Sequence, residues 1–139
     1  MKTVNLTPYL YFDGNCTKAM NFYQGIFGGN IEIMTFGEVD NDCPSAMKDS
    51  VMHASLMGGE VEFFGCDNPV PRPLGTGKIC LTLHGSDEEK LRQFFDALSI
   101  GGEITMPLEK QVWGDIYGSM KDKYDVNWDV NIRIPNNKF

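Results

Sequence analysis

The sequence predicts an α+β fold in which the order β-α-β-β-β occurs twice. A helical pattern of apolar residues with i, i+3, i+4, i+7 spacing recurs 72 positions further along the chain. The two copies are Ala19, Phe22, Tyr23 and Ile26, and Leu91, Phe94, Phe95 and Leu98. Each copy is followed by a glycine pair and then by an isoleucine, which is typical of a helix stop and a new strand. A matching helix, stop and strand in both halves indicate a duplicated module.

Length and composition indicate one compact domain with a hydrophobic core. The chain has 139 residues, 42% of them hydrophobic, including nine Phe, five Tyr and two Trp. Its net charge of −7 argues against a nucleic-acid partner, because phosphate backbones are bound by basic surfaces.

The sequence also bears on the compartment. No apolar stretch approaches the roughly 18 residues of a membrane span, and the N-terminal segment lacks an apolar signal core. We therefore expect a cytoplasmic protein with no membrane partner. Four cysteines, at Cys16, Cys43, Cys66 and Cys80, form no CxxC pair and no zinc-like spacing. We expect them to be reduced and mostly buried, with structural roles for Cys43 and Cys66.

The first half begins with a strand over 4–12 that is rich in Tyr, Leu and Phe. Asn15 or Thr17 is the expected N-cap of a helix that ends at Phe27, before the pair Gly28-Gly29. A strand over 31–36 follows. The polar stretch 38–49 is long for a loop and is a candidate lid.

A hairpin and a linker complete the first half. Strand-like runs over 51–57 and 60–66 flank Gly58-Gly59, which predicts a hairpin. Three prolines and two glycines then follow closely, at Pro69, Pro71, Pro73, Gly75 and Gly77. We therefore expect a single domain over 1–139, with module one at about 3–67, a linker at about 68–77 and module two at about 78–135.

The second half repeats the plan. A strand over 78–83 leads to a capping box, in which Ser86 is the N-cap and Glu89 is three residues further on. The helix continues to Ser99 and stops near Gly101. Strands are expected over 103–106, 113–120 and 126–134, and a turn at 122–125 joins the last two.

Several motifs resemble one known group of proteins. They are Pro8-Tyr9-Leu10-Tyr11-Phe12-Asp13-Gly14-Asn15-Cys16, Phe22-Tyr23, Phe27-Gly28-Gly29, Phe36-Gly37-Glu38, Cys43-Pro44-Ser45, His53-Ala54, Trp113-Gly114 and the segment 122–128. With these motifs the chain resembles the PhnB-like branch of the vicinal-oxygen-chelate superfamily, which contains glyoxalases, bleomycin resistance proteins and extradiol dioxygenases. This branch is often labelled 3-demethylubiquinone-9 3-methyltransferase-like.

The resemblance implies a fold and an assembly. Its two βαβββ modules form a curved, cup-shaped mixed sheet with the helices on the outside, and members are commonly homodimers. Metal-dependent members place one ligand on each of four strands inside the cup. Carried over to this chain, the four positions fall at Thr7 or Pro8, Glu62, Lys78 and Asp129. Of these, Glu62 and Asp129 are plausible ligands. Because two ligands of four do not make such a site, we expect no bound metal. If a divalent ion does bind, we expect Glu62 and Asp129 to be its ligands.

Three residues are candidates for chemistry. His53 is a general base or a ligand if its side chain points into the cup, and a hydrogen-bonded strand residue if it does not. Glu62 and Asp129 form an acid–base pair if both point inward, because their repulsion would raise one pKa. The alternative places each acid on the solvent face of its strand. A second histidine, His84, is expected at the surface.

Aromatic residues are candidates for a ligand pocket. Tyr9, Tyr11, Trp113 and Trp128, together with His53, would line a pocket for an apolar or planar molecule. Packing between helix and sheet is the alternative for each of them.

Three functions compete at this point. The first is the binding or sequestration of a small organic ligand, as in bleomycin resistance proteins. The second is a lyase, isomerase or dioxygenase that uses a divalent metal ion. The third is metal-free, transferase-like chemistry. No cofactor is predicted, and we expect a homodimer whose partner is a small organic molecule.

Overall fold

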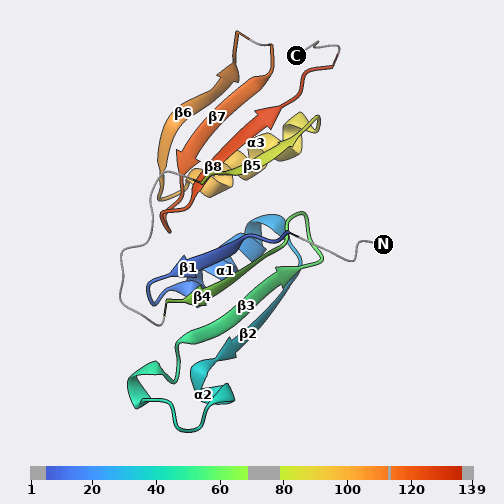
Figure 1. Cartoon of the computed structure of the whole chain (residues 1–139). Coiled ribbons are helices and arrows are strands. Elements are labelled where there is room, and N and C mark those ends of the chain that lie inside the picture. The colour runs from blue at the N-terminus through green and yellow to red at the C-terminus, as the bar shows by residue number, and fades with distance from the viewer. Residues whose placement is uncertain (1–5, 69–78, 113, 136–139) are drawn as a thin grey trace. The chain divides into compact units, whose positions relative to one another are not determined.

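The computed structural model describes residues 6–68, 79–112 and 114–135, and the chain divides into two compact units (Figure 1). The first unit is Met1–Leu74 and the second is Gly75–Phe139. We call them module one and module two. Each contains one four-stranded sheet and one long helix, in the order β-α-β-β-β, so the predicted α+β fold is confirmed.

Module one consists of β1 (Tyr9–Phe12), α1 (Cys16–Phe27), β2 (Asn30–Thr35), β3 (Val51–Met57) and β4 (Phe63–Asp67). The strand order in its sheet is β1-β4-β3-β2. β1 pairs with β4 in parallel, and the other two pairings are antiparallel. α1 packs on one face of this sheet, because its contacts are with β2, β3 and β4.

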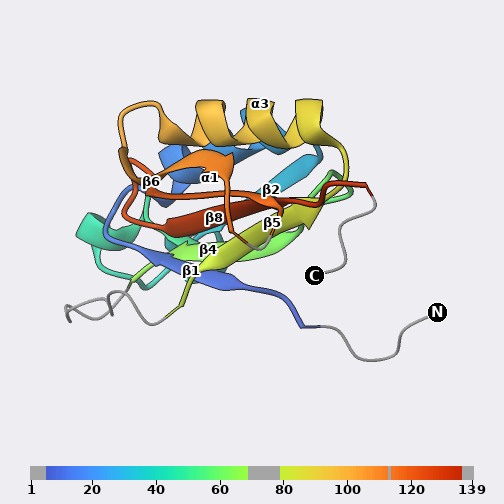
Figure 2. The same ribbon diagram turned by 90° about the horizontal axis from the view of Figure 1, so that it is seen from above.

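Module two consists of β5 (Leu81–Gly85), α3 (Glu88–Ser99), β6 (Glu103–Lys110), β7 (Ile116–Lys121) and β8 (Asn127–Ile132). Its strand order, β5-β8-β7-β6, repeats that of module one. β5 and β8 are parallel, and the remaining pairs are antiparallel. Figure 2 shows α3 lying along one face of its own sheet.

Both cores lie between helix and sheet. Of the residues on the predicted helix faces, five are buried and three are half-buried: the buried ones are Ala19, Tyr23, Leu91, Phe95 and Leu98, and the half-buried ones are Phe22, Ile26 and Phe94. Tyr23 of α1 is fully buried and meets Phe63 of β4 edge-on, with ring centroids 5.2 Å apart. In module two, Phe95 and Leu98 of α3 are buried on the corresponding side. The period of 3.6 residues therefore identified the packed side of each helix, and burial of these side chains supplies most of the driving force for packing.

The two helices are capped differently, and the predicted N-cap position is observed at α1 but not at α3. At α1 the N-cap position is Asn15, but its side chain accepts no capping hydrogen bond. The carboxylate of Asp67, at the end of β4, accepts from the Cys16 backbone N–H at 2.9 Å instead. At α3 the N-cap is Asp87 and not Ser86, and its Oδ1 accepts from the Lys90 N–H at 3.1 Å. Asp87 lies one residue closer to the helix, and a carboxylate there also favours the positive end of the helix dipole.

The predicted hairpin of β3 and β4 is confirmed, but its connection is five residues long, 58–62, and Glu62 lies in it rather than in a strand. The Gly58 N–H donates to Glu62 Oε2 at 2.9 Å. A Cβ placed on Gly59 would lie 2.6 Å from the carbonyl oxygen of Gly28, at the end of α1. The lack of a side chain at Gly59 therefore permits the hairpin connection to lie close to the backbone at the end of α1. Gly58-Gly59 does not form a two-residue turn.

Two further boundaries differ from the prediction. The stretch 38–49 was expected to be a loop, but it begins inside the short helix α2 (Phe36–Val39) and contains a 3-10 helix over Ser45–Met47. The Thr35 side chain caps α2 by accepting from the Glu38 N–H at 3.2 Å. β6 extends to Lys110, beyond the predicted end at 106, because its pairing with β7 continues through two irregularities.

Among the described residues, no helix is both long enough and apolar enough to cross a membrane.

Candidate functional site

Each sheet has one face packed on its helix and one face that the helix does not cover, which we call the open face. In module one, Tyr9 pairs with Phe64, and Tyr11 pairs with Cys66. Because neighbouring residues of a strand point to opposite faces, these residues share the open face, and Leu10 and Phe12 share the helix face. His53 of β3 also lies on the open face, since its neighbour Ala54 is fully buried beneath α1.

Four rings gather on this open face, and we call them the aromatic patch: Tyr9, Tyr11, His53 and Phe64. Tyr9 is at the centre, with ring centroids 5.2 Å from Tyr11, 5.6 Å from His53 and 5.9 Å from Phe64. His53 and Phe64 are 5.1 Å apart. Tyr9 is 38% exposed and Tyr11 is 45% exposed, so large ring surfaces remain available to a solute. Apolar rings on a surface outside the core are typical of a binding surface.

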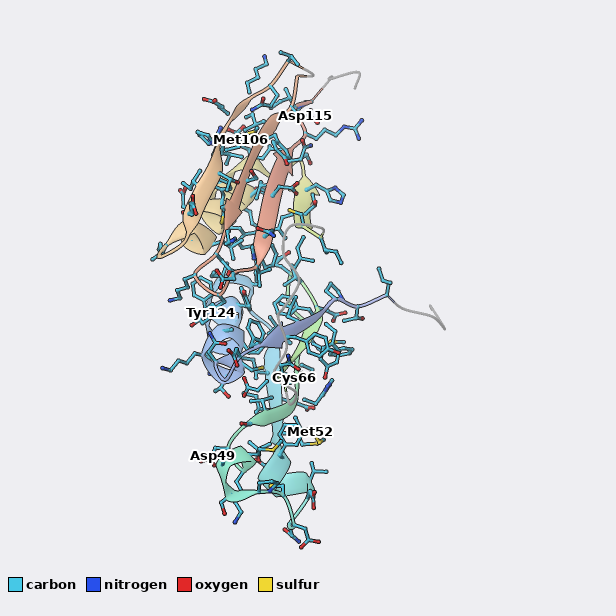
Figure 3. All side chains as sticks on the ribbon, turned by 60° about the vertical axis from the view of Figure 1, so that its left-hand side comes forward. Asp49, Met52, Cys66, Met106, Asp115 and Tyr124 are labelled. Atoms are coloured by element: carbon cyan, nitrogen blue, oxygen red, sulfur yellow. The ribbon has the colours of Figure 1, made fainter. Side chains whose placement is uncertain are left out.

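A hydrogen bond joins two members of the patch. Tyr9 Oη lies 3.0 Å from His53 Nδ1. Burial, together with the charge and hydrogen bonding of the neighbouring Cys66, raises the pKa of the Tyr9 phenol to about 12. The phenol therefore stays protonated at neutral pH. Cys66 itself is buried within module one, and Figure 3 labels it there.

The open face of module two is polar. β8 alternates between Trp128, Val130 and Ile132, which are buried, and Asn127, Asp129 and Asn131, which are half-buried. Tyr117 and Ser119 of β7 pair with Asn131 and Asp129 and therefore share their face. This face offers a carboxylate, amides and hydroxyls where module one offers rings.

Asp129 is the acidic centre of this second face. The Tyr117 hydroxyl donates to its Oδ2 at 2.8 Å. Its Oδ1 is buried and has no hydrogen-bond partner among the described residues. Burial and the Asp129 carboxylate together raise the pKa of Tyr117 to about 12 and that of the Cys80 thiol to about 11. The nearby phenol and thiol are therefore neutral donors at physiological pH.

The structure brings together some of the predicted site residues. Tyr9, Tyr11 and His53 meet in the aromatic patch, and their role in binding a ligand stays a prediction. Asp129 lies on the open face of module two. Glu62 is exposed, lies outside β4 and accepts a hydrogen bond from the Gly58 N–H. Glu62 belongs to module one and Asp129 to module two.

The two tryptophans have different outcomes. Trp128 lies on the helix face of β8, is 2% exposed and donates through Nε1 to Asp122 Oδ2 at 2.8 Å. Its predicted place in a ligand pocket is therefore not observed, and the alternative, packing between helix and sheet, describes it. Trp113 lies outside the described residues.

Neither Phe64 nor Tyr117 was a predicted site residue, although both lie on the open faces. Each lies in a predicted strand, so period-two alternation identified its face. The missing information was the strand register, which sets Phe64 beside Tyr9 and Tyr117 beside Asn131. Register depends on contacts between strands that are distant in sequence, and no local pattern reports it.

The described residues do not fit a metal centre of the four-ligand kind. No group of three or more His, Cys, Asp or Glu side chains among them could hold a metal ion. Catalytic metal sites in proteins take three or more protein ligands. We therefore derive no reaction step through a metal, and the expectation that none binds stays a prediction.

Comparison with known proteins gives the family and the fold. The sequence profile of the 3-demethylubiquinone-9 3-methyltransferase family matches residues 4–131. The protein YjdN of Escherichia coli is 29% identical over 91% of this chain and 94% of its own length. The crystal structure of PA1353 from Pseudomonas aeruginosa is 32% identical, with a TM-score of 0.82 over 94% of this chain and 98% of that one. A PhnB protein from Bacillus cereus is 29% identical, with a TM-score of 0.76 over 94% of this chain and 100% of that one.

More distant structures share the fold alone. A glyoxylase/bleomycin resistance protein/dioxygenase domain from Frankia sp. is 13% identical, with a TM-score of 0.64 over 96% of this chain and 100% of that one. The βαβββ modules are therefore of the glyoxalase and bleomycin resistance type.

Proposed function

The chain belongs to the 3-demethylubiquinone-9 3-methyltransferase family, within the glyoxalase and bleomycin resistance superfamily, and we propose that it binds a small, planar organic molecule through the aromatic patch of module one. The observation that carries this proposal is the Tyr9–His53 hydrogen bond inside a cluster of partly exposed rings. Rings supply apolar area for a ligand, and a few fixed polar groups supply its orientation.

The protonation of this pair defines what the patch offers. Because the raised pKa keeps the Tyr9 phenol protonated, we assign its O–H as the donor to His53 Nδ1. A neutral imidazole that accepts at Nδ1 carries its proton on Nε2. His53 then presents one N–H donor beside the rings. The favoured ligand is a planar molecule that carries a carbonyl or phenolic oxygen at its edge, stacks on Tyr11 or Phe64 and accepts from Nε2.

A thermal-shift screen tests this proposal. Planar aromatic carbonyl compounds should raise the melting temperature of the full chain, and saturated compounds of the same size should not, because a ligand stabilises the state that binds it. His53→Gln removes the ring, and Tyr11→Leu removes a stacking face. Both variants should lose most of the shift while they melt normally without ligand.

The matched control is His84→Gln, which makes the same change at an exposed histidine of module two. For planar compounds that carry no carboxylate or phosphate group, its ligand-induced shift should equal that of the wild type. An equal loss in His53→Gln and His84→Gln, or a screen in which only saturated compounds bind, would contradict the proposal.

The second candidate function is divalent-metal-dependent lyase, isomerase or dioxygenase chemistry, and the unpartnered Oδ1 of Asp129 is the observation that favours it. A carboxylate oxygen of this kind is an acceptable metal ligand. Metal analysis of protein purified without chelator decides between the two candidates. A near-stoichiometric divalent ion that is lost in Asp129→Asn would replace the first candidate by the second. Transferase-like chemistry without a metal ranks third.

We also propose that the chain forms a homodimer, as its resemblance to this superfamily implies. Sedimentation of the full chain at micromolar concentration should give twice the chain mass of 15.6 kDa. A stable monomer at that concentration would contradict the proposal.

A further inference from the structure

We propose that module two holds a separate binding site for a small oxyanion, a carboxylate or a phosphate group. A surface depression of about 420 Å³ lies where β5 and β8 end and β7 begins. It is lined by His84, Gly85, Ser86, Asp115, Asn131 and Arg133. This site lies within module two and does not rest on the function proposed above.

The sheet register brings the lining residues together. β5 and β8 are parallel neighbours, and His84 pairs with Asn131. The Arg133 backbone N–H, one residue after β8, donates to the Gly85 carbonyl at 2.7 Å. Successive residues of a strand alternate between faces, so Arg133 continues the face of Asn131. The guanidinium and the imidazole are thus supplied by two adjacent strands that end at the same edge.

The donors of these two side chains are available. Both residues are exposed, and within the described residues neither side chain forms a hydrogen bond or an ion pair. In the same module, Arg92 is already paired with Glu88 at 2.8 Å. Arg133 therefore keeps its planar fork of N–H groups for a ligand, and such a fork matches the geometry of carboxylate and phosphate oxygens.

The acidic residue that lines the depression accepts hydrogen bonds from within module two. Asp115, labelled in Figure 3, is 6% exposed. Its Oδ2 accepts from Asn131 Nδ2 at 3.0 Å, and its Oδ1 accepts from the Ile134 N–H at 3.3 Å. An incoming solute meets the exposed Arg133 and His84 before this buried carboxylate. The negative charge of Asp115 still lowers the affinity for an anion, so we expect weak but saturable binding.

A second depression provides an internal comparison. It measures about 380 Å³, belongs to module one and is lined by Thr35, Gly37, Glu38, Asn41, Lys48 and Asp49. Its two carboxylates outnumber its single cation. An oxyanion should therefore leave it unoccupied.

The test is an NMR titration of the ¹⁵N-labelled full chain with inorganic phosphate and, separately, with acetate, at constant ionic strength. The amide signals of Gly85, Ser86 and Asn131 should shift and saturate, and those of 35–49 should not. A response to phosphate alone would assign the site to phosphate groups, and a response to acetate alone would assign it to carboxylates. The absence of saturable shifts with both ions would overturn the proposal.

Substitutions distinguish a specific binding site from attraction of the ion by the overall charge of the protein. Arg133→Gln should weaken binding about tenfold or more, because a charge-assisted hydrogen bond contributes more than a neutral one. Lys110→Gln removes the same charge from β6, outside the depression, and should leave the affinity unchanged. His84→Asn should weaken binding by a smaller factor. Equal losses in Arg133→Gln and Lys110→Gln would show that overall charge alone attracts the ion. The spectrum of each free variant reports whether it is folded.

Discussion

Module one and module two have the same strand order and the same helix placement, but their open faces carry different chemistry. Module one presents the aromatic patch, and module two presents a carboxylate surrounded by hydroxyls and amides. On the helix faces the two are alike, with large apolar side chains buried in both. Close packing restricts the helix face to apolar residues that fit, while the open face has no such restriction. A shared topology therefore specifies the core of each module and leaves its function to the other face.

The modules also differ in how their helices begin. In module one, Asp67 of β4 accepts from the N–H groups of Cys16 and Val51, both at 2.9 Å, and so joins helix, β3 and β4. In module two, Asp87 caps the helix that directly follows it. The first cap is a tertiary interaction and the second is local. Substitutions in both modules should reveal these differences as unequal losses of stability and unequal thiol reactivity.

Truncation of a side chain on the buried helix face should cause the largest loss of folding stability. Phe95→Ala should lower the free energy of unfolding by about 3–5 kcal/mol, because it leaves a cavity at a position that is 3% exposed. Phe94 is half-buried on the same helix, so Phe94→Ala should cost clearly less. Urea denaturation measures both. Equal losses would contradict the assigned packing face.

Removal of the tertiary cap should lower the free energy of unfolding more than removal of the local cap. Asp67→Ala should cost about 3 kcal/mol, because it leaves two backbone N–H groups in a buried site without their charged acceptor. Asp87→Ala should cost about 1 kcal/mol, as is usual for an exposed N-cap. If chemical denaturation gives the reverse order, the structural distinction between the two caps is wrong.

The tyrosines of the two open faces should also differ. Tyr117→Phe should cost about 2 kcal/mol, since it removes the donor to a carboxylate whose other oxygen is buried. Tyr9→Phe should cost less than about 1 kcal/mol, because it removes a neutral hydrogen bond at a residue that is more than a third exposed. Thermal denaturation at neutral pH compares them. A larger loss for Tyr9→Phe would place the stronger polar network in module one.

Thiol reactivity should report the charge of Asp129. Partial desolvation and this carboxylate together raise the pKa of Cys80 to about 11, because a less polar environment and a nearby negative charge both disfavour the thiolate. Asp129→Asn should lower that pKa, increase the thiolate fraction at pH 8 and speed alkylation by iodoacetamide about threefold or more. The other three cysteines are buried, so mass spectrometry can follow Cys80.

The matched control for this reaction is Asp125→Asn, which changes an exposed acid in the turn before β8. It should leave the rate unchanged. The same acceleration in both variants would mean that the net charge, and not the position of Asp129, controls the thiol.

Local patterns predicted the regular elements well. The end of α1 at Phe27 and the bounds of β3 followed from a glycine stop and from a run of strand-forming residues. The site was predictable only in part. His53, Tyr9 and Tyr11 could be selected as chemistry-bearing strand residues, but nothing in one segment showed that Phe64 would join them. Alternation sets Trp128 with Val130 and Ile132 on one face of β8, but it does not tell which face the helix covers, and the structure shows that this face is the buried one.

The duplicated β-α-β-β-β order and the packed face of each helix could be predicted from the sequence, because both depend on periodicities that operate within a dozen residues. Contacts between distant segments set which residues meet on the open faces and which carboxylate accepts from the first N–H of α1. Asp67 is 51 residues from Cys16, whose N–H donates to it, and Tyr9 is 44 residues from His53. Such contacts form only once the strand register is set, and the register is decided by the packing of the whole module.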